Sequence, residues 1–108
     1  MKNDTNILDA VYQVVRERKN NPSEESYVAS LYAKGLDKIL GTIGEEATEV
    51  AVAGKGGKLD EVVSEVADLW FHTLVLLGYY DLPPEKIYAE LERRFGTSGL
   101  EEKAGRPG

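Results

Sequence analysis

The sequence predicts an all-α protein, a helical bundle of about five helices in one domain that spans residues 1–108. Three observations lead to this prediction. Apolar residues recur every three or four positions along most of the chain, which is the period of an α-helix. Breaks that contain glycine or proline separate these periodic stretches. No stretch of any length alternates apolar and polar residues as a β-strand does, so we expect no sheet.

The first two helices are marked by their capping residues. Asp4 or Thr5 can cap the start of a first helix, and the stretch 20–22, which contains two asparagines and a proline, ends it. The stretch 23–26 opens a shorter second helix, and Gly35 suits a C-terminal cap. We therefore expect two helices before residue 36. Aromatic side chains in this region and beyond are expected to pack in the core, namely Tyr27, Tyr32 and Trp70.

A helical hairpin is expected in the middle of the chain. The third helix should span about Leu36 to Ala53, and the fourth should span Leu59 to about Tyr79, with a glycine-rich break at 54–58. Residues 69–77 are apolar nearly all round the fourth helix, which indicates burial on every side. In so small a protein this predicts a subunit interface, so we expect the bundle to be completed by homodimerisation.

The third helix has an apolar stripe, and we expect its glutamates to lie mostly on the opposite side. The stripe comprises Leu36, Ile39, Leu40, Ile43, Ala47, Val50 and Ala51.

The C-terminal part contains one more helix. A pair of prolines at 83–84 forms a turn, and proline is favoured at the first helical position. A fifth helix should follow over about 85–94. Residues 97–108 form a polar tail that is either a short helix or disordered.

The composition excludes several classes of function. There is no cysteine, which rules out disulfides and thiol catalysis, and a single histidine rules out a multi-histidine metal site. The net charge of −6 argues against a nucleic-acid partner, because phosphate binding there relies on a basic surface. The longest apolar run is far below the roughly 20 residues that a membrane span needs. No signal-peptide pattern is present, so we expect a cytoplasmic protein without a membrane partner.

Two acidic motifs carry the chemistry of the sequence. Glu45, Glu46 and Glu49 form an E-E-x-x-E pattern, and Glu65 and Asp68 form an E-x-x-D pattern. Within each helix these spacings place the carboxylates about 40° to 60° apart around the axis. An antiparallel helix pair could bring the two acidic faces together, and such a cluster requires a cation because unpaired carboxylates repel one another. Carboxylate oxygens are natural ligands of Mg2+, so the pattern predicts a magnesium site.

Four further residues are candidates for a supporting role. His72 follows Asp68 by four residues and is either a hydrogen-bonded core histidine or a residue that contacts a metal ligand or the substrate. Lys34, Lys38 and Lys55 are the lysines near the acidic motif that could bind substrate phosphate. The alternative interpretation is that the carboxylates form a solvated helix face and the lysines are ordinary surface residues. The protein would then be a non-catalytic helical dimerisation module.

The motifs extend into a resemblance that covers nearly the whole chain. The two acidic motifs resemble those of the all-α NTP pyrophosphohydrolases, the MazG-like group to which dimeric dUTPases are related. The narrower resemblance is to the phosphoribosyl-ATP pyrophosphohydrolases. The stretches that carry it are Ser26–Leu31, Lys34–Ile39, Gly44–Val50, Glu65–His72, Leu74–Leu77 and Glu90–Gly96, with Ser98-Gly99 and Glu102–Ala104 in the tail.

This resemblance implies hydrolysis of 1-(5-phosphoribosyl)-ATP to 1-(5-phosphoribosyl)-AMP and pyrophosphate, an early step (the second) of L-histidine biosynthesis. It also implies Mg2+ dependence and a homodimer. Glu46, Glu49, Glu65 and Asp68 would be the metal ligands. Glu45, which completes the catalytic group with Glu46 and Glu49, would be a further ligand or would orient or deprotonate the attacking water.

One residue departs from the family pattern. Thr42 stands where the family usually carries a lysine, which puts one phosphate contact in doubt but not the reaction. The acidic motifs by themselves specify only the superfamily. A house-cleaning pyrophosphohydrolase that acts on dUTP or damaged NTPs is therefore an alternative enzyme for the same metal site.

Overall fold

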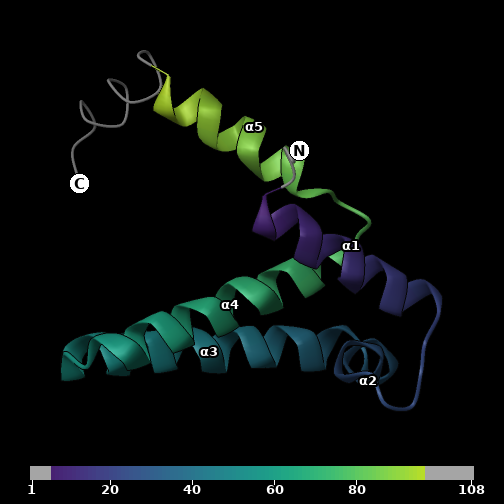
Figure 1. The fold of residues 1–108 in the computed structure, drawn as a ribbon, viewed down its shortest axis with the longest axis horizontal. Helices are drawn as coiled ribbons and strands as arrows, with labels where there is room; N and C mark the ends of the chain where they lie inside the picture. The colour runs from purple at the N-terminus through teal and green to yellow at the C-terminus, as the bar shows by residue number, and fades with distance from the viewer. Residues whose placement is uncertain (1–5, 97–108) are drawn as a thin grey trace.

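The computed structural model describes residues 6–96, and within that range the protein contains five α-helices and no strand (Figure 1). The prediction of an all-α fold is confirmed. The expected caps Asp4 and Thr5 and the polar tail at 97–108 lie outside the described residues. The helices are α1 (Ile7–Asn20), α2 (Tyr27–Lys34), α3 (Leu36–Gly56), α4 (Leu59–Tyr79) and α5 (Pro84–Phe95).

Local chemistry accounts for most of the helix ends. Asn6 caps α1, because its side chain accepts a hydrogen bond from the Asp9 backbone N–H. Ser26 caps α2. Helix α3 continues three residues beyond the predicted end, because Gly57 is the first residue of the glycine-rich break with a left-handed conformation, at φ 75°. A positive φ ends a helix at little cost only in glycine.

The helices are arranged around one long hairpin. Helices α3 and α4 run antiparallel and pack along each other (Figure 1). Helix α1 packs against α4, and α2 packs against α3 and α1 at one end of the hairpin. Helix α5 contacts α1 and extends away from the hairpin. The core lies where α1 and α2 meet the hairpin, and its buried residues are Val15, Val28, Leu31, Ile39 and Val75.

The buried side of α3 differs from the predicted one. Glu46 lies on the inner side of α3, one turn after Ile43, and is partly buried, whereas Leu40, Ala47 and Ala51 are exposed. The prediction that this stripe is buried and the glutamates lie opposite it is therefore wrong for these residues. The physical reason is that α4 covers the side of α3 that carries Glu46. The outer apolar stripe is left without a partner in the single chain.

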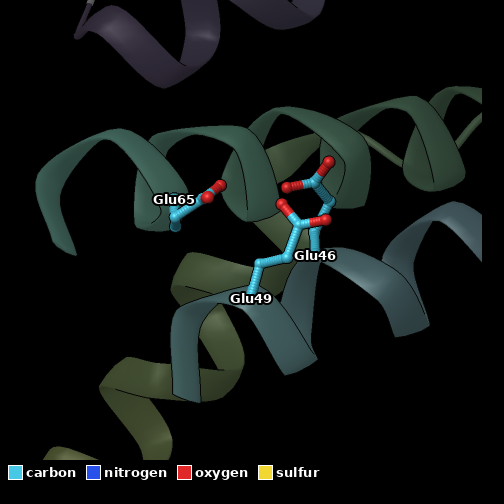
Figure 2. Close-up of side chains that lie close together, drawn as sticks. All are labelled: Glu46, Glu49 and Glu65. Carbon is cyan, nitrogen blue, oxygen red and sulfur yellow. The ribbon is translucent and has the colours of Figure 1, made fainter. Parts of the chain in front are cut away.

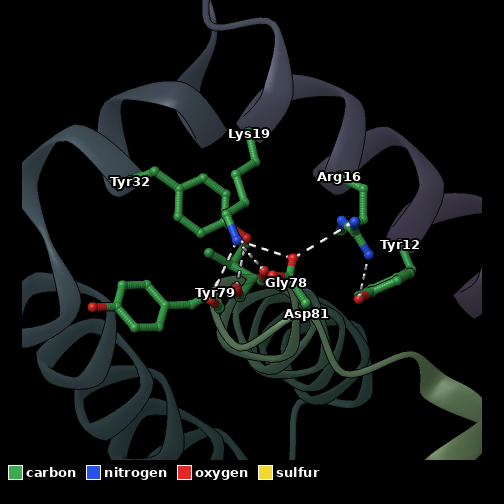
Figure 3. A network of polar contacts seen from close by, with 8 residues as sticks. Tyr12, Arg16, Lys19, Tyr32, Gly78, Tyr79 and Asp81 are labelled. Carbon is green, nitrogen blue, oxygen red and sulfur yellow. Dashed lines mark hydrogen bonds and ion pairs between the residues drawn. The ribbon is translucent and has the colours of Figure 1, made fainter.

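A polar network fixes α1 and α2 to the end of α4 (Figure 3). The Lys19 ammonium donates to the carbonyl oxygens of Gly78 (2.9 Å) and Tyr79 (3.2 Å) and pairs with Asp81 at 3.1 Å. These are carbonyls of the last turn of a helix, which lack partners within the helix and favour a cation. The network thus caps α4 with a residue of α1.

Gly78 permits this close packing, and its replacement by alanine is expected to destabilise the protein. An added Cβ would overlap the Tyr32 hydroxyl and lie 3.0 Å from Val15 Cγ1. The Tyr32 hydroxyl cannot retreat freely, because it donates to the Val75 carbonyl at 2.7 Å. Overpacking of this kind lowers the free energy of unfolding by about 1–3 kcal/mol, which chemical denaturation measures.

The matched control for Gly78→Ala is Gly41→Ala, because no atom lies within 4 Å of its added Cβ. Gly41→Ala should be neutral or stabilising, since alanine favours a helix. Equal stability of Gly78→Ala and the wild type would contradict this account of the packing.

Helix α4 is long and apolar enough to cross a membrane when judged by length and composition alone. Core helices of soluble proteins pass the same test. Here the helix carries Glu65, Asp68 and His72 along its middle, and one of these, His72, is buried within the protein. We therefore interpret α4 as a core helix.

Candidate active site

Three carboxylates meet between α3 and α4 (Figure 2). Glu46 and Glu49 come from α3, and Glu65 comes from α4. One carboxylate oxygen from each lies within 4.8 Å of the other two. The i, i+3 spacing on α3 directs two side chains toward the same stretch of α4, and the antiparallel hairpin places the third opposite them. We call these three residues the carboxylate cluster.

The carboxylates of the cluster repel one another and are partly withdrawn from water. Burial, followed by the charges of Glu49 and Asp68, raises the pKa of Glu46 above its usual value. Burial, the charge of Glu49 and a hydrogen bond with Glu49 raise the pKa of Glu65. The Oε2 atom of Glu46 is buried and has no hydrogen-bond partner among the described residues. Each of these effects disfavours the ionised form, so the cluster binds protons or cations more readily than isolated glutamates do.

The cluster fits a divalent cation that prefers oxygen ligands. Three carboxylate oxygens lie close enough together to share one ion. A cation would satisfy the unpartnered Glu46 oxygen and neutralise the repulsion that raises the two pKa values. The donor set contains no sulfur or nitrogen atom, which favours a hard cation over softer metals.

Two predicted site residues lie beside the cluster. Asp68 is exposed and does not belong to the group of three, but its charge contributes to the raised pKa values of Glu46 and Glu65. Glu45 is also exposed, and its charge acts on Glu46. The structure thus gathers three of the four predicted metal ligands tightly and leaves Asp68 and Glu45 at the rim.

His72 is a buried, fully hydrogen-bonded histidine with 5 % of its surface exposed. Its Nδ1 lies 2.8 Å from the Asp68 carbonyl oxygen, and a carbonyl can only accept, so Nδ1 carries a proton. Its Nε2 lies 2.9 Å from the Tyr27 hydroxyl. In the neutral ring the Tyr27 hydroxyl therefore donates this hydrogen bond and Nε2 accepts it. This arrangement connects α2 to α4 beside the carboxylate cluster.

Tyr27 is the residue of this region that sequence reasoning misplaced. It was expected in the core with Tyr32 and Trp70, but 54 % of Tyr27 is exposed, as is 54 % of Trp70. The Ser26 cap contained the missing signal, because it fixes Tyr27 as the first residue of α2, where a side chain can lie at the edge of the helix packing.

The predicted phosphate-binding lysines are all exposed. On α3, Lys38 lies within about 20° of both Glu45 and Glu49 around the helix axis, whereas Lys55 lies about 180° from Glu46. Lys34 is the last residue of α2. Thr42 is buried, and its hydroxyl donates to the Lys38 carbonyl, so it supplies no charge.

Comparisons with known proteins decide the family. The family model described as phosphoribosyl-ATP pyrophosphohydrolase matches residues 8–95. The chain belongs to the phosphoribosyl-ATP pyrophosphohydrolase family. This confirms the resemblance found in the sequence, and it identifies the chain as a hydrolase family member. The matched range includes all three residues of the carboxylate cluster.

Similar curated proteins agree with the family assignment. The chain is 68 % identical over 101 residues to a phosphoribosyl-ATP pyrophosphatase of Geobacter metallireducens, covering 94 % of this chain and 93 % of the relative. It is 58 % identical over 106 residues to the protein of that name in Pelobacter propionicus, covering 98 % of each chain. The protein of that name in Methylococcus capsulatus is 53 % identical over 100 residues, with 93 % of this chain and 95 % of the relative covered.

Proposed function

We propose that this protein hydrolyses 1-(5-phosphoribosyl)-ATP to 1-(5-phosphoribosyl)-AMP and pyrophosphate in the cytoplasm, as the second step of L-histidine biosynthesis. The observation that carries the proposal is the family match over residues 8–95, within which the carboxylate cluster lies. The names of the similar curated proteins support the substrate. Among the described residues, the carboxylate cluster is the group of acidic side chains close enough to hold a metal.

The metal of the proposed reaction is Mg2+. Glu46, Glu49 and Glu65 would hold it, and Asp68 would be the fourth ligand from the rim. When bound, Mg2+ neutralises charge on the polyphosphate and acts as a Lewis acid. The chain itself holds the carboxylates at their separation through the α3–α4 packing. Because α3 and α4 are both rigid helices, the carboxylates need little reorganisation when the ion binds.

Glu45 is the proposed proton acceptor of the reaction. It is exposed, adjacent in sequence to Glu46, and close enough to affect the pKa of that residue. A carboxylate outside the group of three remains free to accept a proton from water through one of its oxygens. The water would supply the oxygen atom that forms the new bond to phosphorus as pyrophosphate departs.

Lys38 is expected to bind substrate phosphate, since it shares the α3 face with Glu45 and Glu49. A charge-assisted hydrogen bond to phosphate contributes about 1.5–3 kcal/mol, so Lys38→Met should lower kcat/KM roughly 10- to 150-fold. Lys34→Met, at the end of α2, is expected to show a similar loss. Lys55 was predicted as a third phosphate ligand. Because it lies about 180° from Glu46 around α3, Lys55→Met is the variant with which Lys38→Met and Lys34→Met are compared. Steady-state kinetics at saturating Mg2+ measure all three. A Lys38→Met enzyme with the wild-type kcat/KM would contradict this assignment.

We also propose that the protein is a homodimer. The outer stripe of α3 with Leu40, Ala47 and Ala51 is exposed in the single chain, as is Trp70 on α4. A groove of about 430 Å³ opens between α1, α4 and α5, and its lining is almost wholly apolar. Exposed apolar surfaces on a helix bundle can mark protein–protein interfaces. A second copy would cover them.

Substrate comparison tests the proposed function against its alternatives. A pyrophosphate-release assay with phosphoribosyl-ATP and with dUTP, each with and without Mg2+, is the direct experiment. We expect Mg2+-dependent release from phosphoribosyl-ATP and little from dUTP. Faster release from dUTP would favour a house-cleaning pyrophosphohydrolase. Absence of release from either would favour a non-catalytic dimerisation module.

A further inference from the structure

Tyr27 presents a rigid aromatic ring to solvent beside the carboxylate cluster. Its hydroxyl is held by His72 at 2.9 Å, and its ring stacks on Phe71 with a centroid separation of 6.4 Å and an interplanar angle of 25°. The His72 ring meets it edge-on at 5.8 Å. Despite these contacts, 54 % of the residue remains exposed. A ring that is already immobilised loses little conformational entropy when a ligand packs on it.

The position of Tyr27 follows from the direction of the hairpin. Helix α2 packs against α3, and the Tyr27 hydroxyl lies 2.9 Å from His72 of α4. His72 is close enough to act on the pKa of Glu46, so Tyr27 stands on the Glu46 side of the carboxylate cluster. The hydroxyl is close enough to feel the charges of Glu46, Asp68 and Glu45, which together with burial raise the pKa of Tyr27. A ligand whose polyphosphate lies on the carboxylate cluster would therefore reach this ring as it leaves the cluster.

Trp70 and Tyr80, two other exposed aromatic residues of the described chain, are less well placed. Trp70 lies about 160° from Asp68 around α4, so it faces away from the cluster. Tyr80 lies at the C-terminal end of α4, next to Tyr79. The glycine-rich stretch at the other end of the hairpin, residues 54–58, contains only glycine and lysine.

We propose that Tyr27 contacts the substrate and that its exposed ring packs against the nucleoside part of the molecule whose polyphosphate occupies the carboxylate cluster. This inference rests on the proposed function. His72 acts as a positioning residue, because its Nε2 accepts a hydrogen bond from the Tyr27 hydroxyl and thereby fixes the ring. Because the hydroxyl hydrogen of Tyr27 already forms the hydrogen bond to His72, the hydroxyl oxygen can only accept a hydrogen bond from the substrate.

The experiment compares Tyr27→Leu with Tyr27→Phe. Stacking of a base on one aromatic ring corresponds to about a 5- to 150-fold change in affinity, so Tyr27→Leu should raise the KM for phosphoribosyl-ATP within that range while kcat changes little. Tyr27→Phe keeps the ring and should retain a KM within about threefold of wild type. The matched control is Tyr80→Leu, a tyrosine with 56 % exposure away from the cluster, which should behave as the wild type.

Two binding measurements separate a substrate contact from a structural role. Inhibition by tripolyphosphate with Mg2+, a ligand without a nucleoside, should be equal in the wild type and in Tyr27→Leu. The Kd of phosphoribosyl-AMP, measured by calorimetry, should rise in Tyr27→Leu by the same factor as KM. Weaker tripolyphosphate inhibition in Tyr27→Leu would overturn the inference, because Tyr27 would then act through the carboxylates.

These measurements distinguish a failure of the proposed reaction from a failure of the proposed Tyr27 contact. A wild-type protein that binds phosphoribosyl-AMP more tightly than Tyr27→Leu but releases no pyrophosphate would contradict the proposed reaction and support the contact. A wild-type protein that releases pyrophosphate, with unchanged KM and product Kd in Tyr27→Leu, would support the reaction and overturn the contact.

Discussion

Replacing Glu49 with glutamine is expected to lower kcat at saturating substrate at least about 100-fold and to raise the melting temperature of the metal-free protein at pH 7. The activity estimate follows because loss of even an indirect partner of a metal ligand costs about 10- to 100-fold. Glu49 is the proposed ligand whose charge acts most strongly on both of its neighbours. The Asp68→Asn variant, at the rim of the cluster, should also lose most of its activity.

The stability gain of Glu49→Gln has a defined pH dependence. The pKa values of Glu46 and Glu65 in the folded protein lie above the ordinary value of 4.5. The folded protein therefore holds protons that the unfolded chain releases, and the contribution of these groups to the free energy of unfolding falls as pH rises from 4.5 through the raised values. Removing the Glu49 charge should therefore stabilise the metal-free protein more at pH 7 than at pH 4.

Thermal unfolding of the metal-free wild type and of Glu49→Gln at pH 4 and pH 7 measures this effect, and steady-state kinetics measure the loss of activity. Glu92→Gln is the matched control, because Glu92 is an exposed glutamate on α5 away from the carboxylate cluster. That variant should keep its activity. Near-normal turnover by Glu49→Gln would show that the proposed ligand set is wrong.

A charge in the apolar groove is expected to separate the two copies of the proposed dimer. Ile87 lines the groove from α5 and is 43 % exposed in the single chain, so glutamate at this position should be tolerated by the monomer. In a dimer the same carboxylate would be buried without a partner, at a cost of several kcal/mol. Since about 1.4 kcal/mol changes an equilibrium constant tenfold, the dissociation constant of the dimer should rise at least about 100-fold.

Sedimentation equilibrium at micromolar concentration provides the measurement. The wild type should sediment at twice the chain mass of 11.9 kDa, and Ile87→Glu should sediment as a monomer that remains folded. Val14→Glu is the control, because Val14 on α1 is 50 % exposed and does not line the groove. A wild-type chain that sediments as a monomer would defeat the dimer proposal.

Much of the fold was predictable because helix signals are local. The bounds Leu59–Tyr79 of α4 were predicted from periodicity and the flanking breaks, and the spacing of Glu46, Glu49 and Glu65 correctly indicated that these carboxylates could meet. The break after α3 was predicted too early, since three residues of the glycine-rich stretch remain helical and Gly57 is the one that adopts a positive φ.

Which face of a helix is covered could not be predicted in the same way. Periodicity describes positions around one helix, but the choice of neighbour belongs to tertiary packing. Helix α4 covers the side of α3 with Glu46, so Leu40 and Ala47 are exposed instead. Tyr27 was misplaced for a related reason. The Ser26 cap indicates that Tyr27 begins α2, but the spacing of α2 does not indicate that His72 of α4 binds its hydroxyl and leaves the ring exposed.

The most direct test of the central claim is pyrophosphate release from phosphoribosyl-ATP by the wild type and by Glu46→Gln over a titration of Mg2+. The Glu46 side chain carries the unpartnered buried oxygen that the metal would satisfy. We expect no release without Mg2+, saturable release by the wild type, and a loss in Glu46→Gln that added Mg2+ does not restore. Release by the wild type that is independent of Mg2+, or equal saturation by Glu46→Gln, would contradict the account.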